Sequence, residues 1–132
     1  HLVNPYCFRP PIAPHIAAEQ AGVDIQIEVI QSAFEELKQM ADIVIVEGAG
    51  GLLVPLNAHH TIADLIACLN IPILFVVGMR LGCINHALLT MEVMQARSLN
   101  VAAWVANPID PSMLCYDENL RTLQTKLHAT PQ

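Results

Sequence analysis

The chain has 132 residues, of which 54% are hydrophobic and 14% are charged, and its net charge is −6. Because disordered chains are poor in apolar residues and rich in charge, this composition excludes disorder. The charged share is well below the usual value of about 25%, so we expect further protein to cover part of the surface. The sequence therefore predicts one partial domain over residues 1–132, a piece of a larger protein.

Composition also disfavours several classes of partner. The six lysines and arginines are scattered and form no basic stripe, which argues against nucleic-acid binding. No apolar run reaches the roughly 20 residues that a membrane span needs. We expect a cytoplasmic protein with neither a nucleic acid nor a membrane as its partner. The cysteines are too far apart for a zinc site or a disulfide framework and are typical of free thiols: Cys7, Cys68, Cys83 and Cys115.

The first forty residues predict a loop and two helices. Four prolines between residues 5 and 14 predict an ordered loop. Pro14 suits the first turn of a short helix over 14–20, which Gly22 ends. Asp24 is a candidate N-cap for the next helix. The apolar residues of that helix recur at helical spacing, so it is amphipathic: Ile30, Ala33, Phe34, Leu37 and Met40.

Beyond residue 40, short apolar runs alternate with helical patterns. The predicted strands cover 43–46, 73–77 and 101–106. The predicted helices cover 61–69, 84–98 and 117–128. This alternation predicts an α/β fold, a parallel β-sheet with flanking helices in three Rossmann-like layers. Since three strands are few for so apolar a chain, we expect the sheet to be incomplete, with further strands supplied by sequence outside these residues.

Each predicted strand ends in a distinctive loop, and the three loops cover 47–51, 78–85 and 107–110. In open α/β sheets, ligands bind beyond the carboxyl ends of the strands, so we expect one composite site. Glu47 is a carboxylate directly after an apolar run, which suits a magnesium ion. The glycines after it let the backbone approach a phosphate. A glycine-rich turn with an exposed glutamate is the structural alternative.

Other polar features have both a functional and a structural explanation. The segment 82–85 stands at a helix start, where free N–H groups and the helix dipole favour an anion, but an ordinary helix start has the same pattern. Asn107 can contact a nucleobase or satisfy backbone groups in its turn. His59 and His60 near Asp64 invite a metal interpretation, yet adjacent histidines in a loop have no fixed geometry. Solvated histidines are favoured there.

Four motifs in and around these loops are distinctive: Val46-Glu47-Gly48-Ala49-Gly50-Gly51, Val54-Pro55-Leu56, Leu81-Gly82-Cys83-Ile84-Asn85-His86-Ala87 and Trp104-Val105-Ala106-Asn107. Together they resemble dethiobiotin synthetase, a P-loop NTPase-like enzyme, and the resemblance covers about residues 3–110. The Glu-Gly-Ala-Gly-Gly stretch alone is shared with other P-loop synthetases. Its combination with Leu-Gly-Cys-Ile-Asn-His is highly specific.

The resemblance implies an ATP-dependent cyclo-ligase of biotin biosynthesis. In that family the diamino carboxylic acid 7,8-diaminononanoate (7,8-diaminopelargonate) captures CO2 as a carbamate. The carbamate oxygen attacks the γ-phosphate of ATP with the help of Mg²⁺, and the second amine then closes the ureido ring of dethiobiotin and expels phosphate. The implied cofactors are ATP and Mg²⁺.

The resemblance also assigns site residues. Glu47 would be a ligand of Mg²⁺, and Asn107 would contact adenine with Pro108 beside it. The phosphate end of ATP would be lined by Gly48, Ala49 and Gly50. The tail carboxylate of the substrate would be held, across a homodimer interface, by Gly82, Cys83, Ile84 and Asn85. The predicted helix over 84–98 suits such an interface, because it has apolar residues on more than one face.

Several parts of that family have no counterpart in this sequence. They are the phosphate loop that ends in Gly-Lys-Thr, the catalytic lysine, and the magnesium-binding aspartate. We therefore assign no catalytic residue within the chain and expect this piece alone to be inactive. Two alternatives stay open: another P-loop synthetase or partitioning-type ATPase, and a non-catalytic dimerisation fragment.

Overall fold

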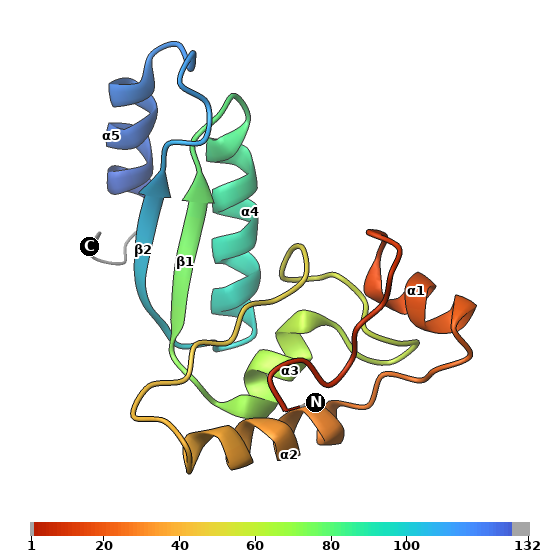
Figure 1. Ribbon diagram of the computed structural model, residues 1–132. Coiled ribbons are helices and arrows are strands. Elements are labelled where there is room, and N and C mark those ends of the chain that lie inside the picture. The colour runs from red at the N-terminus through yellow and green to blue at the C-terminus, as the bar shows by residue number, and fades with distance from the viewer. Residues whose placement is uncertain (1, 128–132) are drawn as a thin grey trace. The chain divides into compact units, whose positions relative to one another are not determined.

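Residues 2–127, which the computed structural model describes, form helices and strands in the order α1, α2, α3, β1, α4, β2 and α5 (Figure 1). Their contacts divide the chain into two units, His1–Leu69 and Asn70–Gln132. The helices of the first unit are α1 (Pro14–Gln20), α2 (Ile27–Lys38) and α3 (Ile62–Leu69). The second unit contains β1 (Ile73–Gly78), α4 (Cys83–Ala96), β2 (Val101–Asn107) and α5 (Tyr116–Lys126). No helix among the described residues is long and apolar enough to cross a lipid bilayer.

Helix α1 begins and ends where the sequence predicts. Pro14 stands in its first turn, where the missing N–H of proline costs no hydrogen bond. At the other end Gly22 adopts a φ of +66°, and the amide of Val23 donates to the carbonyl of Ala18 at 2.9 Å. This geometry is a Schellman motif, which satisfies carbonyls that the end of a helix leaves unpaired.

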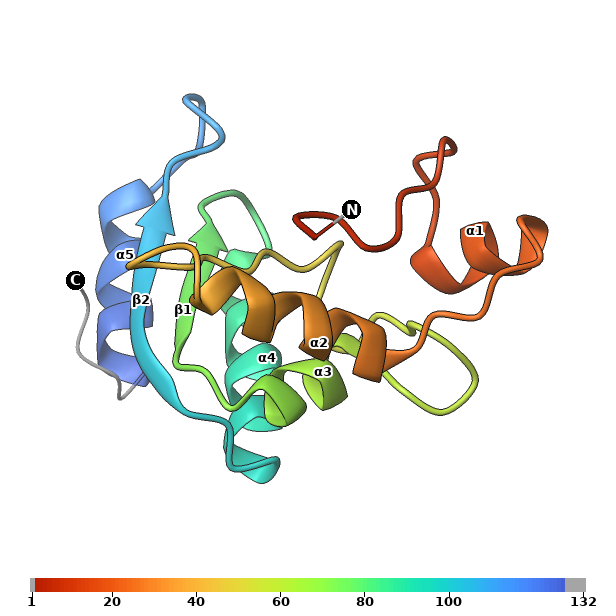
Figure 2. The ribbon, with the colours of Figure 1, turned by 60° about the horizontal axis from the view of Figure 1, so that its bottom comes forward.

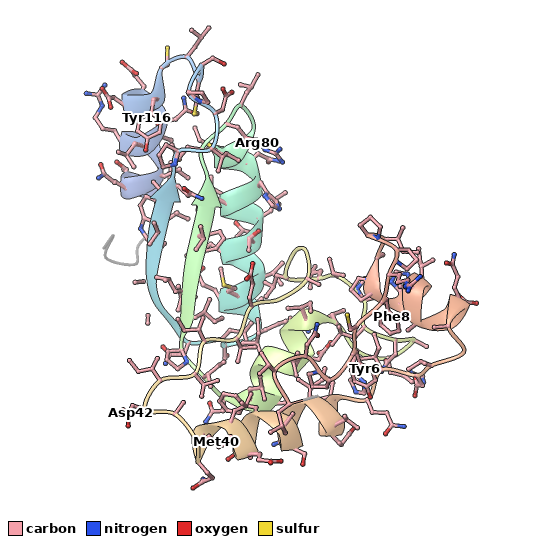
Figure 3. The ribbon with its side chains drawn as sticks, viewed as in Figure 1. Tyr6, Phe8, Met40, Asp42, Arg80 and Tyr116 are labelled. Carbon is pink, nitrogen blue, oxygen red and sulfur yellow. The ribbon has the colours of Figure 1, made fainter. Side chains whose placement is uncertain are left out.

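Helix α2 begins later than predicted. Its N-cap is Gln26, so the assignment of Asp24 as the N-cap is wrong. Ile25 lies between the two, is 3% exposed, and accepts a hydrogen bond on its carbonyl from the side chain of Asn57, which holds this residue outside the helix. The amide of Gln26 donates to the hydroxyl of Tyr6 at 3.1 Å, and Figure 3 shows Tyr6 in this unit.

The amphipathic pattern of α2 is confirmed in its middle and fails at its end. Ala33 and Phe34 are buried, and Lys38 on the polar face pairs with Glu35 at 2.9 Å. Met40, predicted on the apolar face, is 68% exposed, because the helix ends at Lys38 before reaching it.

The predicted strand over 43–46 does not form. Residues 43–48 have no regular secondary structure, and the side chains of Ile43 and Ile45 are 80% and 88% exposed. A strand is stabilised when a neighbouring strand exchanges ladder hydrogen bonds with it, and within the described residues only β1 and β2 pair in this way. The prediction rested on β-branched composition, which does not supply a partner, and it is wrong here.

Helix α3 confirms the prediction for 61–69. It begins at Ile62, and Asn70 directly after it adopts a left-handed φ of +48°. Helix α3 packs against α2 (Figure 2), and the thiol of Cys68 donates to the side-chain oxygen of Gln31 on α2 at 3.3 Å. The two helices bury apolar faces against each other, which gives the first unit its core.

In the second unit, β1 and β2 are parallel neighbours, as the alternation of strand and helix predicts (Figure 1). Phe75 pairs with Trp104, and Gly78 pairs with Asn107 at the carboxyl ends. Helix α4 connects the strands and packs on β1, and α5 packs on α4. Side chains exposed by 1% or less fill the core: Trp104, Met79, Met94, Ala87, Leu123 and Leu127.

The ends of the last two helices differ slightly from the prediction. Helix α4 stops at Ala96 because Ser98 turns left-handed, with a φ of +54°, and the amide of Leu99 returns to the carbonyl of Met94. Helix α5 begins at Tyr116 and ends at Lys126. The end predicted for it, His128, lies outside the described residues.

Candidate functional site

The loops after β1 and β2 meet at the carboxyl edge of the two-stranded sheet. The amide of Met79 donates to the carbonyl of Asn107 at 2.7 Å, one step beyond the last paired residues of the ladder. A Cβ on Gly78 would lie 2.8 Å from Cδ1 of Ile109, so the loop after β2 lies directly on the end of β1. The structure therefore brings together two of the three loops that the sequence predicts to converge.

The N-terminus of α4 directly follows the loop after β1. Gly82 is its N-cap and adopts a φ of +95°, which an L side chain rarely adopts, and no described side chain caps this end of the helix. The amide of Cys83 donates to the carbonyl of Arg80 at 3.0 Å, which closes the turn marked by Arg80 in Figure 3. The first-turn amides of Ile84 and Asn85 have no helical carbonyl to bond, which is the feature that makes a helix N-terminus suit an anion.

This geometry narrows the predicted anion site. Of the residues 82–85, Cys83 has its amide engaged in the turn, and its side chain is buried at 4% exposure. The donors of the site are therefore Ile84 and Asn85, on a turn that Gly82 shapes.

Asn107 serves its turn through its backbone, and its contact with a nucleobase stays a prediction. Its carbonyl accepts from Met79 and so serves the turn. Its residue is exposed, and among residues 2–127 its side-chain amide makes no hydrogen bond, which leaves an amide donor and acceptor for a ligand. Pro108, next to it, is exposed as well.

Asp110 organises the loop after β2. Its Oδ1 accepts a hydrogen bond from the hydroxyl of Ser112 at 2.7 Å and another from the amide of Ser112 at 2.9 Å. These two bonds, the hydroxyl first, hold the pKa of the Asp110 carboxyl below its usual value. The loop is thus closed by an ionised side chain that is itself open to solvent.

The loop 47–51 belongs to the first unit, and all of its residues are exposed. Among residues 2–127 the carboxylate of Glu47 makes no hydrogen bond or ion pair. Gly50 adopts a φ of +89°, and a Cβ there would lie 3.0 Å from Cγ2 of Val54, so glycine is needed at this turn. Its predicted convergence with the loops of the second unit stays a prediction.

The segment after that loop bonds the start of α3, an arrangement that the sequence did not predict. The carbonyls of Leu52 and Val54 accept hydrogen bonds from the amides of Ala63 and Ile62, at 2.9 and 3.0 Å. The first-turn amides of α3 are therefore used by the chain between the glycine-rich loop and the helix. The pattern Thr61-x-x-Asp64 before an apolar run was the signal for this helix start.

The histidines lie at a different place in the same unit. His59 and His60 border an open cavity of about 390 Å³ together with Asp24, Gln26, Glu28, Asn57 and Ala58. The described residues contain no group of three His, Cys, Asp or Glu side chains that could hold a metal ion. Nδ1 of His60 is buried and has no hydrogen-bond partner within residues 2–127.

Parallel strands connected by a helix, with polar loops at their carboxyl ends, make an α/β fold, and the family match described next gives its class as P-loop NTPase-like, as the sequence predicts. A family model described as "AAA domain" matches residues 1–130, across both units, and the chain belongs to that family.

Curated relatives give a more particular likeness. The chain is 57% identical over 125 residues to a Nitrosospira multiformis protein named ATP-dependent dethiobiotin synthetase BioD, a match that covers 95% of this chain and 55% of the relative. Proteins of the same name from Aromatoleum aromaticum and Pseudoalteromonas translucida are 54% and 45% identical over 127 residues, each covering 96% of this chain and 56% of the relative. The resemblance predicted from the motifs is confirmed, and the chain spans just over half the length of these relatives.

The hydrogen bonds around Asp110 predict a measurable titration. Since the pKa of this carboxyl is lowered in the folded chain, its contribution to stability is present above the pKa of the unfolded state and is lost as pH falls through the folded value. In Ser112→Ala the pKa of Asp110 should rise toward its ordinary value, because the hydroxyl donor is gone while the amide of residue 112 remains. An NMR titration that follows the carboxyl carbon of Asp110 measures this pKa.

The control for that titration is Thr122→Ala, which removes a hydroxyl that bonds the carbonyl of Glu118 on α5. It should leave the pKa of Asp110 unchanged. An Asp110 pKa that is the same in Ser112→Ala and in the unaltered protein would contradict the assignment.

Proposed function

We propose that the intact protein carrying this chain is an ATP-dependent dethiobiotin synthetase. The observation that supports it best is the identity of 57% over 125 residues with a relative of that name, since the match runs through all the candidate site loops. The relatives do not favour the alternatives of another P-loop synthetase, a partitioning-type ATPase or a non-catalytic fragment.

The proposed reaction forms two bonds to one carbon atom. One amine of 7,8-diaminononanoate adds to CO2 and loses a proton, which gives a carbamate. A carbamate oxygen attacks the γ-phosphorus of ATP, and ADP leaves. The second amine then attacks the carbamate carbon and loses a proton, phosphate leaves, and the ureido ring of dethiobiotin is closed. The task of the protein is to hold a carboxylate-tailed diamine in line with a triphosphate.

Mg²⁺ fits the residues at the start of the glycine-rich loop. This ion commonly binds through one or two carboxylates together with substrate phosphates and water, so it does not require a cage of protein ligands. Glu47 offers an exposed carboxylate that no described residue engages. In our proposal Glu47 holds Mg²⁺, which neutralises charge that develops on the transferred phosphoryl group.

The nucleotide and the substrate are assigned to different residues of the candidate site. We assign the phosphate end of ATP to Gly48, Ala49 and Gly50, whose backbone is exposed. The side-chain amide of Asn107, which no described residue bonds, suits adenine, with Pro108 beside it. The turn of Gly82, Cys83, Ile84 and Asn85 would hold the tail carboxylate of the substrate, with the amides of Ile84 and Asn85 as donors.

A homodimer is part of this proposal, with the α4 turn of one subunit serving the site of the other. On α4 the side chains of Met91 and Met94 are buried within the unit, whereas Leu89 on another face is 57% exposed. A second apolar face supports an interface there. We also propose a cytoplasmic location and small-molecule partners only.

The first prediction of this proposal concerns the effect of Glu47 on the reaction rate. The intact protein should form dethiobiotin from 7,8-diaminononanoate, bicarbonate as the source of CO2, ATP and Mg²⁺. Glu47→Gln keeps the shape of the side chain and removes its charge, so the rate should fall on the order of 10²–10³-fold. The matched control is Glu36→Gln on the exposed face of α2, which should keep the full rate. A fully active Glu47→Gln protein would exclude the glutamate as a metal ligand.

The second prediction concerns the affinity of the turn 82–85 for the tail carboxylate of the substrate. A helix N-terminus stabilises a nearby negative charge by about 0.3–1 kcal/mol, and by roughly 2 kcal/mol when partly buried. The methyl ester of 7,8-diaminononanoate should therefore bind several-fold to tens of fold more weakly than the acid, while the affinity for ATP stays the same. Calorimetric titration measures both. Equal affinity for ester and acid would place the tail carboxylate elsewhere.

The proposed dimer is tested by sedimentation velocity of the intact protein at micromolar concentration. We expect a dimer that Leu89→Glu weakens, because that change sets a charge on the exposed apolar face of α4. Glu92→Gln, at another exposed position of the same helix, is the control and should leave the dimer intact. A fully active monomer would contradict this part of the proposal.

A further inference from the structure

The residues after the glycine-rich loop form a closed clasp with the start of α3. We call residues 52–63 the clasp. Pro55 and Thr61 form an antiparallel bridge, the amide of Ile62 donates to the carbonyl of Val54, and the amide of Ala63 donates to the carbonyl of Leu52. The clasp closes at the start of α3, and its far end is the turn around Asn57. The chain directly before the clasp is the loop 47–51.

The side chain of Asp64 stabilises the closed end of the clasp. Its Oδ2 accepts hydrogen bonds from the amide of Thr61 at 2.7 Å and from the hydroxyl of Thr61 at 2.6 Å. The amide of Asp64 donates in turn to the carbonyl of Thr61 at 3.1 Å. Because these bonds fix the first turn of α3, they fix the direction of the amides that bind the carbonyls of Leu52 and Val54.

The far end of the clasp is tied as well. Oδ1 of Asn57 accepts hydrogen bonds from the amides of His59 and His60, both at 2.9 Å, and its Nδ2 donates to the carbonyl of Ile25 at 2.6 Å. The turn of the clasp is thereby attached to the chain that precedes α2. The clasp is anchored at both ends.

The glycine-rich loop rests on this anchored structure. A Cβ built on Gly48 would lie 3.3 Å from Cγ2 of Ile62, the first residue of α3, which is 7% exposed. The amide of Val54 donates to the carbonyl of Gly51 at 3.0 Å. The side chain of Ile62, at the start of α3, therefore lies against Gly48 in the loop. The amide of the same residue bonds Val54, which closes the turn after the loop.

We propose that Asp64 is a positioning residue for the nucleotide end of the site: by closing the clasp it holds Ile62 against Gly48 and so sets the place of the loop 47–51. Asp64 touches neither ATP nor metal in this proposal, and acts through Thr61 and Ile62. The proposal rests on the proposed function for the identity of the ligand, and on the hydrogen bonds and the Gly48 contact for the mechanism.

The test compares Asp64→Ala with Asp64→Asn in the intact protein. Loss of a capping side chain costs about 0.5–2 kcal/mol, which corresponds to about 2- to 30-fold in an equilibrium. The amide of Val54 should therefore exchange its hydrogen about 2- to 30-fold faster in Asp64→Ala, and ATP in the presence of Mg²⁺ should bind more weakly by a similar factor. Affinity for the diamino acid should not change. Asp64→Asn keeps an oxygen acceptor for Thr61 and should restore most of both properties.

The matched control is Tyr6→Phe, which removes a hydrogen bond at the start of α2 in the same unit. It should change neither the exchange of the Val54 amide nor the affinity for ATP. If Asp64→Ala speeds that exchange yet binds ATP as the unaltered protein does, the clasp is only structural and the proposal is overturned. Unchanged exchange overturns it too.

A second measurement does not depend on whether Asp64→Ala folds, because it uses variants of Gly48 and Ile62 instead. Gly48→Ala should weaken ATP binding, because its Cβ meets Cγ2 of Ile62. Ile62→Ala removes that atom and should relieve the defect in the double variant, whereas Ile62→Val keeps the branched carbon and should not. Equal behaviour of the two double variants overturns the proposal. A protein that forms no dethiobiotin but binds ATP in this pattern would overturn the proposed function and leave the positioning role intact.

Discussion

The parallel ladder between β1 and β2 determines where the two loops at its carboxyl edge begin. Gly78 and Asn107 are its last paired residues, and the bond from the Met79 amide to the Asn107 carbonyl extends it into the loops themselves. The segments after β1 and β2 therefore leave the sheet at the same edge and from directly paired residues. The turn at Gly82 and the bonded loop at Asp110 are consequences of that common starting point.

The two units use the start of a helix in opposite ways. In α3 the first amides donate to carbonyls of the preceding chain, and the carboxylate of Asp64 accepts a hydrogen bond from the amide of Thr61. The positive end of the α3 dipole is therefore satisfied by the protein itself. In α4 the N-cap is Gly82, no described side chain caps the helix, and the amide of Cys83 is engaged in the turn. The same element thus serves as an anchor in one unit, and in the other it leaves the amides to which we assign the substrate carboxylate in our proposal.

Elements whose signals are local could be predicted from the sequence, and those that depend on a distant partner could not. The β1 and β2 strands and the turn at Gly82 follow from apolar runs and from one glycine. The run 43–46 is as apolar as those strands but has no described partner strand, and composition cannot supply one. Within the site, the engaged amide of Cys83 depends on the exact path of a turn, which residue types do not specify.

The unpaired run 43–46 has a consequence for solubility. Ile43 and Ile45 are almost fully exposed, and a β-branched run without proline is the composition from which cross-β aggregates grow. If such a run becomes extended, its unpaired backbone groups can pair with another copy of itself. Asp42 and Glu47 flank the run as charged gatekeepers, both exposed. The glutamate proposed to hold a metal ion therefore also places a negative charge beside the exposed apolar run, and a charge in that position disfavours stacking of like segments.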